Sequence, residues 1–243
     1  MLGGRVVLCQ PRRGHRFGHD AILLAAATPA QPGEHAVDFG AGVGAAGLAL
    51  AARVPSVRVT LAEIDPALVG LAADNIVRNG FADCVRAVVL DVTAGARAFA
   101  TAALPPGSVA RVLMNPPFNE PRTSRASPDP VRRRAHVSVG IAPWLRSAER
   151  VLRRGGTVTL IWRADGLAEV LAALAQGFGA VVVLPVHPLA EAPAIRVLVR
   201  AVKGSRAPLA LLSGLVLAAA DGRPSEEAEA VLRHGAALPL FHV

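Results

Sequence analysis

Short runs of apolar residues alternate with longer apolar or amphipathic segments along most of the chain. Glycine, proline or asparagine separates these segments, so most runs have a clear end. A short apolar run is typical of a buried strand, and a longer periodic one is typical of a helix. The pattern therefore predicts an α/β fold with a doubly wound sheet. The expected strands are 36–39, 57–62, 85–90, 109–114, 157–162, 180–186 and 194–202, and the expected helices are 21–27, 45–53, 66–78, 93–103, 142–152 and 165–176.

Both ends of the chain extend this core. Residues 5–9 read as a short strand, residues 209–217 as a further strand or a buried helix, and a last helix opens at Ser225. We see no internal repeat and no stretch with the composition of a domain linker. We therefore expect one domain over 1–243. It comprises an N-terminal strand, loop and helix in 1–33, a core in 34–203 and a C-terminal extension in 204–243.

The composition is that of a globular chain. Of its 243 residues 52% are hydrophobic and 18% are charged, which allows a sizeable core. The longest apolar runs, such as 207–220, are shorter than the roughly 18 residues that span a bilayer, and the N-terminus does not have the pattern of a secretory signal. Cys9 and Cys84 fit neither a metal site nor a disulfide framework. We expect a cytoplasmic protein with no metal, no membrane contact and no obligate protein partner.

The charge of the chain suggests a polyanionic partner. The formal net charge is +8, and Lys203 is the only lysine. Abundant Ala, Arg, Gly and Pro without any Tyr is also typical of GC-rich codons, so local clusters are more informative. The most basic cluster is the stretch 119–136, which reads either as a solvated charged loop or as a loop that binds phosphates. We predict that its three consecutive arginines, Arg132, Arg133 and Arg134, bind RNA.

A glycine-rich turn lies between the strand 36–39 and the helix 45–53. Its glycines at 40, 42 and 44 let the backbone approach a ligand at the carboxyl end of the strand and the amino end of the helix. Glu63 ends the next strand, about 20 residues further on, where an acid meets the ribose hydroxyls in dinucleotide sites. The turn and the acid predict a nucleoside-containing cofactor held by Gly40, Gly42, Gly44 and Glu63.

Two cofactors fit this turn. Residues 42–47 match the G-x-G-x-x-G pattern of dinucleotide sites, which suits a nicotinamide oxidoreductase. Asp38, however, lies two residues before Gly40, where a carboxylate suits a cation better than a pyrophosphate. S-adenosylmethionine carries an ammonium and a sulfonium group and no phosphate, so we expect it to be the cofactor. Asp91, after the strand 85–90, could accept the adenine amino group or could cap the following helix.

The sequence Asn115-Pro116-Pro117-Phe118 follows the apolar strand 109–114. The two prolines fix the backbone behind Asn115, and Phe118 could stack on a flat base. The lone pair of an exocyclic amine is delocalised into its ring, so the amine is a poor nucleophile. Two acceptors, the Asn115 side-chain oxygen and the Pro116 carbonyl, could bind its N–H groups and favour the nucleophilic form. The motif predicts methylation of a planar amine; the simpler alternative is a turn that leaves a strand.

Four segments, at 10–24, 38–44, 115–118 and 221–227, resemble the Rossmann-like methyltransferases that use S-adenosylmethionine. Within that family they resemble the bacterial tRNA(Val) adenine-N6-methyltransferase-like group. The resemblance implies a seven-stranded, mostly parallel sheet whose last strand is antiparallel.

The resemblance also implies roles for single residues. It places the cofactor on the glycine turn, Glu63 on the ribose, Asp91 on the adenine and Asn115 on the amine. The segment 16–20 matches a family segment that closes over the methionine end of the cofactor. It therefore adds two residues to the expected cofactor site, Phe17 and Asp20.

The substrate is less constrained than the reaction. This chain has Phe118 where the group more often has Tyr, and His19 where Thr or Ser is frequent. The Asn-Pro-Pro-aromatic motif also occurs in DNA adenine, ribosomal guanine and protein glutamine methyltransferases. We predict an N-methyltransferase that acts on an RNA base. Among the possible amines, adenine N6 in tRNA is the first choice. The remaining alternatives are a nicotinamide oxidoreductase and a non-catalytic RNA-binding module.

Overall fold

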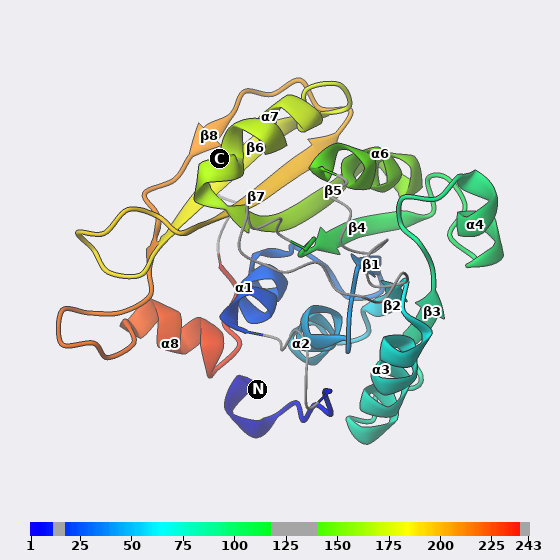
Figure 1. Ribbon diagram of the computed structural model, residues 1–243, viewed down its shortest axis with the longest axis horizontal. Helices are drawn as coiled ribbons and strands as arrows, with labels where there is room; N and C mark the ends of the chain where they lie inside the picture. Colours follow the sequence, from blue (N-terminus) through cyan, green and yellow to red (C-terminus); the bar gives the residue numbers. More distant parts are fainter. Residues whose placement is uncertain (12–17, 118–139, 239–243) are drawn as a thin grey trace, which may run out of the picture.

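The computed structural model describes residues 1–11, 18–117 and 140–238. Within these ranges a central twisted sheet has helices on both of its faces (Figure 1). The strands are β1 (His35–Phe39), β2 (Arg58–Glu63), β3 (Val85–Val89), β4 (Val109–Met114), β5 (Leu152–Arg163), β6 (Phe178–His187), β7 (Arg196–Lys203), β8 (Ala210–Leu211) and β9 (Leu215–Val216).

The strand order is β3-β2-β1-β4-β5-β7-β6-β8, and β9 also pairs with β6. β1 to β5 pair in parallel with one another, and β7 runs antiparallel to both β5 and β6. The expected doubly wound α/β sheet with an antiparallel last core strand is therefore confirmed. The two-residue strands β8 and β9 add to the seven long strands and come from the stretch 209–217, for which the sequence predicts either a strand or a buried helix.

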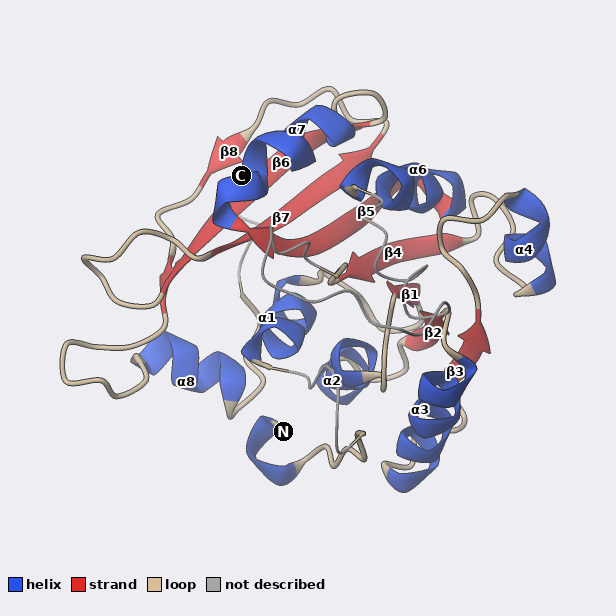
Figure 2. Cartoon of the chain, viewed as in Figure 1, coloured by secondary structure: helices blue, strands red, loops and turns tan. Residues whose placement is uncertain are grey.

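The helices cover the two faces of the sheet (Figure 2). One face carries α1 (His19–Ala27), α2 (Ala45–Arg53) and α3 (Pro66–Arg78), whose buried residues include Leu24, Leu50 and Ile76. The other carries α4 (Ala96–Thr101), α6 (Ile141–Val151) and α7 (Leu167–Leu174), which pack Phe99 and Leu145 against the sheet. The remaining short elements are η1 (Leu2–Gly4), η2 (Ala164–Gly166) and α8 (Glu226–Leu232).

Residues 5–9 do not form the strand that the sequence predicts. They run beside α3, where the Asn79 carboxamide bonds both backbone groups of Val7, each at 2.8 Å. One helical turn away the Asn75 carboxamide does the same for Cys9, at 2.7 and 2.9 Å. Two amide side chains thus satisfy backbone groups that a neighbouring strand would have paired, so no ladder is needed.

The C-terminal extension returns to the sheet before it ends in α8. Ser225 caps this helix, as expected, because its hydroxyl accepts from the amide of Ala228 at 3.0 Å. No helix within the described ranges is long and apolar enough to cross a bilayer.

Candidate active site

The carboxyl ends of four neighbouring strands bring predicted site residues to one edge of the sheet. Asn115 directly follows β4, Gly40 follows β1, Glu63 ends β2, and Asp91 lies just beyond β3. Because paired strands lie roughly 4.8 Å apart, the four positions span roughly 15 Å of this edge. Between β1 and β4 the strand order reverses, which is where open α/β sheets bind ligands.

The glycine turn is fixed to the sheet and open on one side. The Gly40 amide donates to the carbonyl of Ala62 on β2 at 2.8 Å. Gly44 lies against Leu61 of the same strand and has a left-handed φ of 89°. Gly42 has a φ of 56°, and a Cβ added to it would meet no described atom within 4 Å. The turn therefore leaves room for a ligand beside Gly42.

Glu63 is bound to the glycine turn. Its Oε2 accepts from the Gly42 amide at 2.9 Å, and its Oε1 accepts from the amides of Ile64 and Asp65 at 2.8 and 3.0 Å. A carboxylate oxygen can accept more than one hydrogen bond, so Oε2 keeps capacity for a ribose hydroxyl. The structure brings Glu63 and the turn together; the ribose contact stays a prediction.

Asp38 lies beneath the turn and is only 2% exposed. Its Oδ2 accepts from the Gly47 amide in the first turn of α2 at 2.9 Å. Burial raises the pKa of Asp38 to about 7; the Gly47 hydrogen bond opposes the rise, and the charge of Glu63 adds to it. A cation bound at the turn would favour the charged form of this carboxyl. Direct contact between Asp38 and a cofactor stays a prediction.

The raised pKa of Asp38 has a measurable consequence. Without ligand, we expect the Asp38 contribution to the free energy of unfolding to fall as pH rises from about 4 to about 7, because the folded state holds this proton more tightly than the unfolded one. Asp38→Asn keeps an acceptor for Gly47 and removes the charge. Thermal unfolding should therefore show the variant gaining stability relative to the parent between about pH 4 and about pH 7. A pH-independent difference would contradict the raised pKa.

Asp91 is exposed and forms a local turn. Its Oδ1 accepts from the amide and the hydroxyl of Thr93, at 2.8 and 2.7 Å. The N-cap of α4 is Gly95, so the alternative that Asp91 caps this helix is wrong, and α4 begins three residues later than the expected 93. A contact between Asp91 and adenine stays a prediction.

Asn115 has a buried and unsatisfied side-chain oxygen. Its Oδ1 has no hydrogen-bond partner within the part of the chain that the structure describes. Pro116 behind it is buried, and Pro117 is exposed. A buried acceptor without a partner costs about 1–3 kcal/mol, so such a group calls for an explanation. A bound N–H group would supply the missing donor.

Trp144 on α6 contacts the turn, a contact that no sequence pattern predicts. A Cβ added to Gly40 would lie 2.7 Å from Cη2 of this ring. Gly40 also has a left-handed φ of 68°, so both space and backbone conformation require glycine there. No local sequence signal joins α6 to the turn, because the contact depends on how the helix packs over the sheet.

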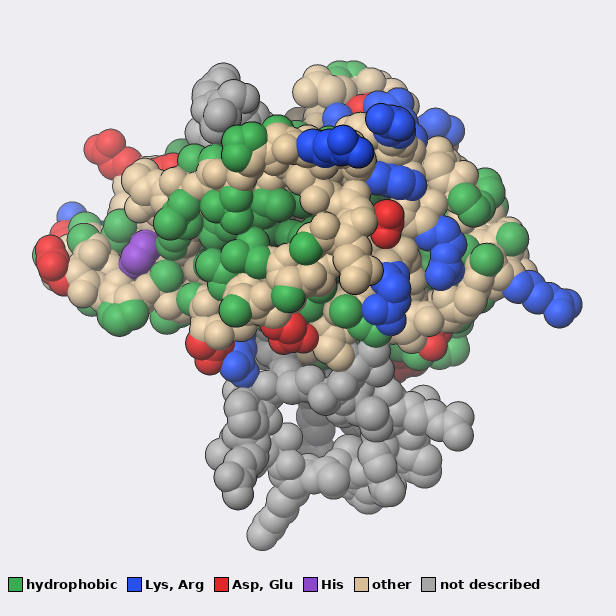
Figure 3. Space-filling model, turned by 90° about the horizontal axis from the view of Figure 1, so that it is seen from above, with side chains coloured by type: hydrophobic (Ala, Val, Ile, Leu, Met, Phe, Trp, Pro, Cys, Tyr) green, Lys and Arg blue, Asp and Glu red, His purple; other side chains and the backbone are tan. Residues whose placement is uncertain are grey.

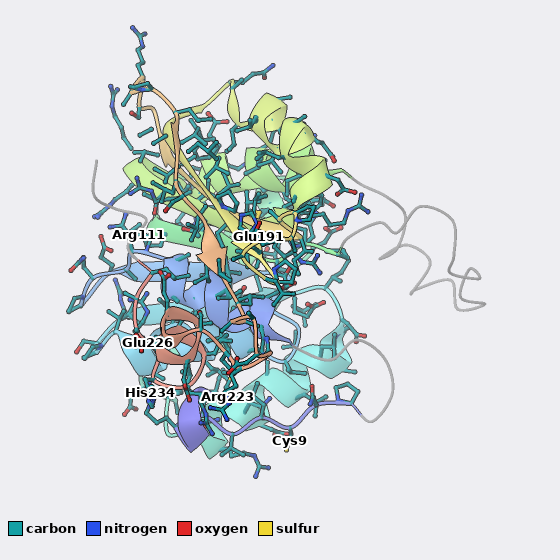
Figure 4. All side chains as sticks on the ribbon, turned by 90° about the vertical axis from the view of Figure 1, so that its left-hand side faces the viewer. Cys9, Arg111, Glu191, Arg223, Glu226 and His234 are labelled. Carbon is teal, nitrogen blue, oxygen red and sulfur yellow. The ribbon has the colours of Figure 1, made fainter. Side chains whose placement is uncertain are left out.

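Asn75 on α3 joins the N-terminal segment to the glycine turn. It is fully buried, and its Nδ2 donates to the Val43 carbonyl at 3.0 Å as well as to Cys9, which lies beside α3 in Figure 4. Val43 stands between two of the turn's glycines, so Asn75 holds the turn from behind. The only sequence signal is a pair of asparagines one helical turn apart, Asn75 and Asn79, which is equally typical of a solvated face.

Asn75→Ala should weaken the binding of S-adenosylmethionine, the expected cofactor, roughly threefold to tenfold. The substitution removes the hydrogen bond from Asn75 to the Val43 carbonyl of the turn, and one such bond contributes about 1 kcal/mol net. Asn79→Ala is the matched control, because Asn79 holds Val7 of the same segment and none of its hydrogen bonds in the described chain reaches the turn. Calorimetric titration should show weaker binding for Asn75→Ala alone, although both variants should unfold at lower temperature. Equal affinities would make Asn75 a purely structural residue.

The remaining predicted site residues are not brought to the turn by the described chain. Asp20 on α1 accepts from Nε of Arg196 on β7 at 3.0 Å, and its contact with a cofactor stays a prediction. Five predicted residues lie outside the described residues: Phe17, Phe118, Arg132, Arg133 and Arg134.

The known proteins that this chain resembles are described as methyltransferases. Residues 16–187 match the family model described as Methyltransferase small domain. A 23S rRNA (uracil(1939)-C(5))-methyltransferase RlmD of Acidithiobacillus ferrooxidans is 37% identical over 128 residues, which are 52% of this chain and only 28% of that protein. A tRNA1(Val) (adenine(37)-N6)-methyltransferase of Dickeya chrysanthemi is 28% identical over 225 residues, 90% of this chain and 86% of that one. A solved structure from Agrobacterium tumefaciens, described as a predicted O-methyltransferase, has a TM-score of 0.77 and 30% identity, and covers 90% of this chain and 98% of its own.

Proposed function

Because the chain belongs to the methyltransferase small domain family, we propose that it transfers a methyl group to the exocyclic amine of an RNA base, adenine N6 in tRNA. The protein is a methyltransferase that depends on S-adenosylmethionine. The nicotinamide oxidoreductase and the non-catalytic RNA-binding module, both considered from the sequence, are therefore wrong.

The described residues fit this cofactor. Gly42 faces open space, Glu63 beside it keeps acceptor capacity, and the buried carboxyl of Asp38 lies under the same turn. These residues offer hydrogen-bond acceptors and carboxyl groups, and none of them is basic. Such a site suits a nucleoside with a cationic tail. When bound, S-adenosylmethionine supplies an electrophilic methyl group. We assign Glu63 and the glycine turn to its nucleoside and Asp38 to the region of its cationic end.

One observation carries the choice of an amine: the buried, unpartnered Oδ1 of Asn115. An exocyclic amine has two N–H groups, and Oδ1 together with the Pro116 carbonyl offers two acceptors at the tip of β4. Binding both would draw the nitrogen lone pair out of the ring and stabilise the positive charge that grows on the amine as it reacts. It would also satisfy the orphaned oxygen, so part of the binding energy is specific for an N–H donor.

A hydroxyl substrate fits this tip less well. It has one hydrogen to donate, and it reacts as an oxyanion, which two carbonyl-type acceptors would repel. The O-methyltransferase description of the Agrobacterium tumefaciens protein therefore does not decide the acceptor for this chain. The Asn-Pro-Pro chemistry argues for nitrogen.

The RNA substrate rests on the relatives and on charge. The Dickeya chrysanthemi relative, matched over nearly the whole of both chains, is named for adenine N6 in a tRNA. The Acidithiobacillus ferrooxidans relative is named for ribosomal RNA, but the match covers little of that protein. The net charge of +8 also suits RNA. Ribosomal guanine and protein glutamine stay as alternative amines, and a cytoplasmic location stays a prediction.

A methylation assay tests the proposal. The protein is incubated with methyl-labelled S-adenosylmethionine and one acceptor in each reaction. The acceptors are unmodified tRNA transcripts, ribosomal RNA and a release factor. We expect N6-methyladenosine in the digested tRNA by mass spectrometry. Methylated guanine in ribosomal RNA, or methylglutamine in the release factor, would identify another amine as the substrate. A methylated ribose or other hydroxyl would contradict the role given to Asn115.

A further inference from the structure

Arginines recur on α4, on α6 and at the start of β5. Figure 3 views the molecule from the side of α6 and α7, and Lys and Arg side chains gather over the half that α4 and α6 cover, whereas hydrophobic side chains dominate the other half. The only acid that α4 and α6 themselves carry is Glu149. The arginine strip consists of Arg97, Arg146, Arg150, Arg153 and Arg154.

The strip leads away from the site edge of the sheet. Trp144, near the start of α6, lies against Gly40 of the turn, so this end of the helix is beside the site. The helix ends at Val151, and β5 then begins opposite Val109, the first residue of β4, at the other edge. Exposed positions along α6 therefore run from the methylation site across the face of the molecule.

Two members of the strip have structural contacts. The Arg150 guanidinium lies 5.5 Å from the centre of the Phe99 ring and donates to the Ala94 carbonyl, which holds α4 beside α6. Arg153 pairs with Glu34 at 2.8 Å. Cations near the end of α6 also suit its dipole, as the sequence alone suggests. That account does not extend to Arg97, which lies on another helix.

We propose that the arginine strip binds the phosphate backbone of the RNA whose base enters the Asn115 site. Arg97, Arg146 and Arg154 are exposed, so their charges are available for phosphates along the path from the site towards the opposite edge of the sheet. Phosphate contacts position a nucleic acid without reading its sequence, which is the role needed to bring one base to the tip of β4. This inference rests on the proposed RNA substrate, and it adds where that RNA lies.

Salt-dependent RNA binding tests the strip. Each phosphate contact contributes about 0.7 to 0.9 to the slope of log affinity against log salt. Replacing three strip arginines with Ala should flatten this slope by about 2 to 3 for unmodified tRNA transcripts, while calorimetry shows unchanged affinity for S-adenosylmethionine. The substitutions are Arg97→Ala, Arg146→Ala and Arg154→Ala.

The control removes the same charge elsewhere. Three exposed arginines on α3 and in the C-terminal extension serve for this, and Figure 4 labels one of them, Arg223, in the lower half of the view. The control should keep the parental slope. If both triple variants flatten the slope equally, or neither does, the strip assignment is overturned. If the parent itself shows no salt-dependent RNA binding, the RNA substrate fails and the strip with it. The control substitutions are Arg78→Ala, Arg223→Ala and Arg233→Ala.

Discussion

Asn115→Ala should slow methyl transfer roughly 10²-fold to 10³-fold and leave the affinity for S-adenosylmethionine close to that of the parent. This is the scale on which one preorganised polar contact at a reacting centre contributes. The variant would leave the amine only the Pro116 carbonyl as an acceptor, so its lone pair would stay in the ring. Single-turnover rates at saturating cofactor measure this step apart from product release. A parental rate would remove Asn115 from the reacting centre.

Two further variants separate the chemical role of Asn115 from packing. Thr159 on β5 is fully buried, pairs with Leu113 of β4, and its hydroxyl also lacks a partner within the described chain. Thr159→Val should leave the rate unchanged, because replacing an unpaired hydroxyl by an apolar group of the same shape is nearly neutral. Asn115→Asp keeps an acceptor oxygen and should lose less activity than Asn115→Ala. Equal losses in Thr159→Val and Asn115→Ala would mean that disturbing this part of the core is enough to slow the reaction.

The grouping of the site residues could be predicted from the sequence because it follows from topology. Glu63 and Asn115 are far apart along the chain, yet each ends or follows a strand of a parallel sheet. Parallel strands place their carboxyl ends at one edge, so strand assignment alone brings these residues together. The glycine turn is a local signal of the same kind, since its positive φ values need only the residues of the turn itself.

The contacts that support the site could not be predicted in this way. The bonds from Asn75 to Cys9 and Val43 cross 66 and 32 residues of sequence, and nothing in the local pattern distinguishes Asn75 from a solvated asparagine. Residues 5–9 do not form the predicted strand for the same reason, because their hydrogen-bond partners are side chains of α3, which is distant in sequence. Asp91 does not cap α4 for a local reason. The amide and the hydroxyl of Thr93 donate to its carboxylate and are nearer in sequence than the amides of α4.

Glu63→Ala should weaken the binding of S-adenosylmethionine by about 1.5 to 3 kcal/mol, or about 10-fold to 150-fold in Kd, the range for hydrogen bonds to a charged group. The substitution removes the proposed acceptor of the ribose hydroxyls and also the bond from Gly42 that shapes the turn. Asp65→Ala is the matched control: Asp65 lies two residues away and caps α3 through the Ala67 amide, so its loss should lower thermal stability and leave the affinity unchanged. Glu63→Gln keeps the size of the side chain and one acceptor oxygen, and its affinity should fall between those of Glu63→Ala and the parent. Calorimetric titration of the four proteins measures these differences, and an unaltered Kd for Glu63→Ala would place the ribose on another residue.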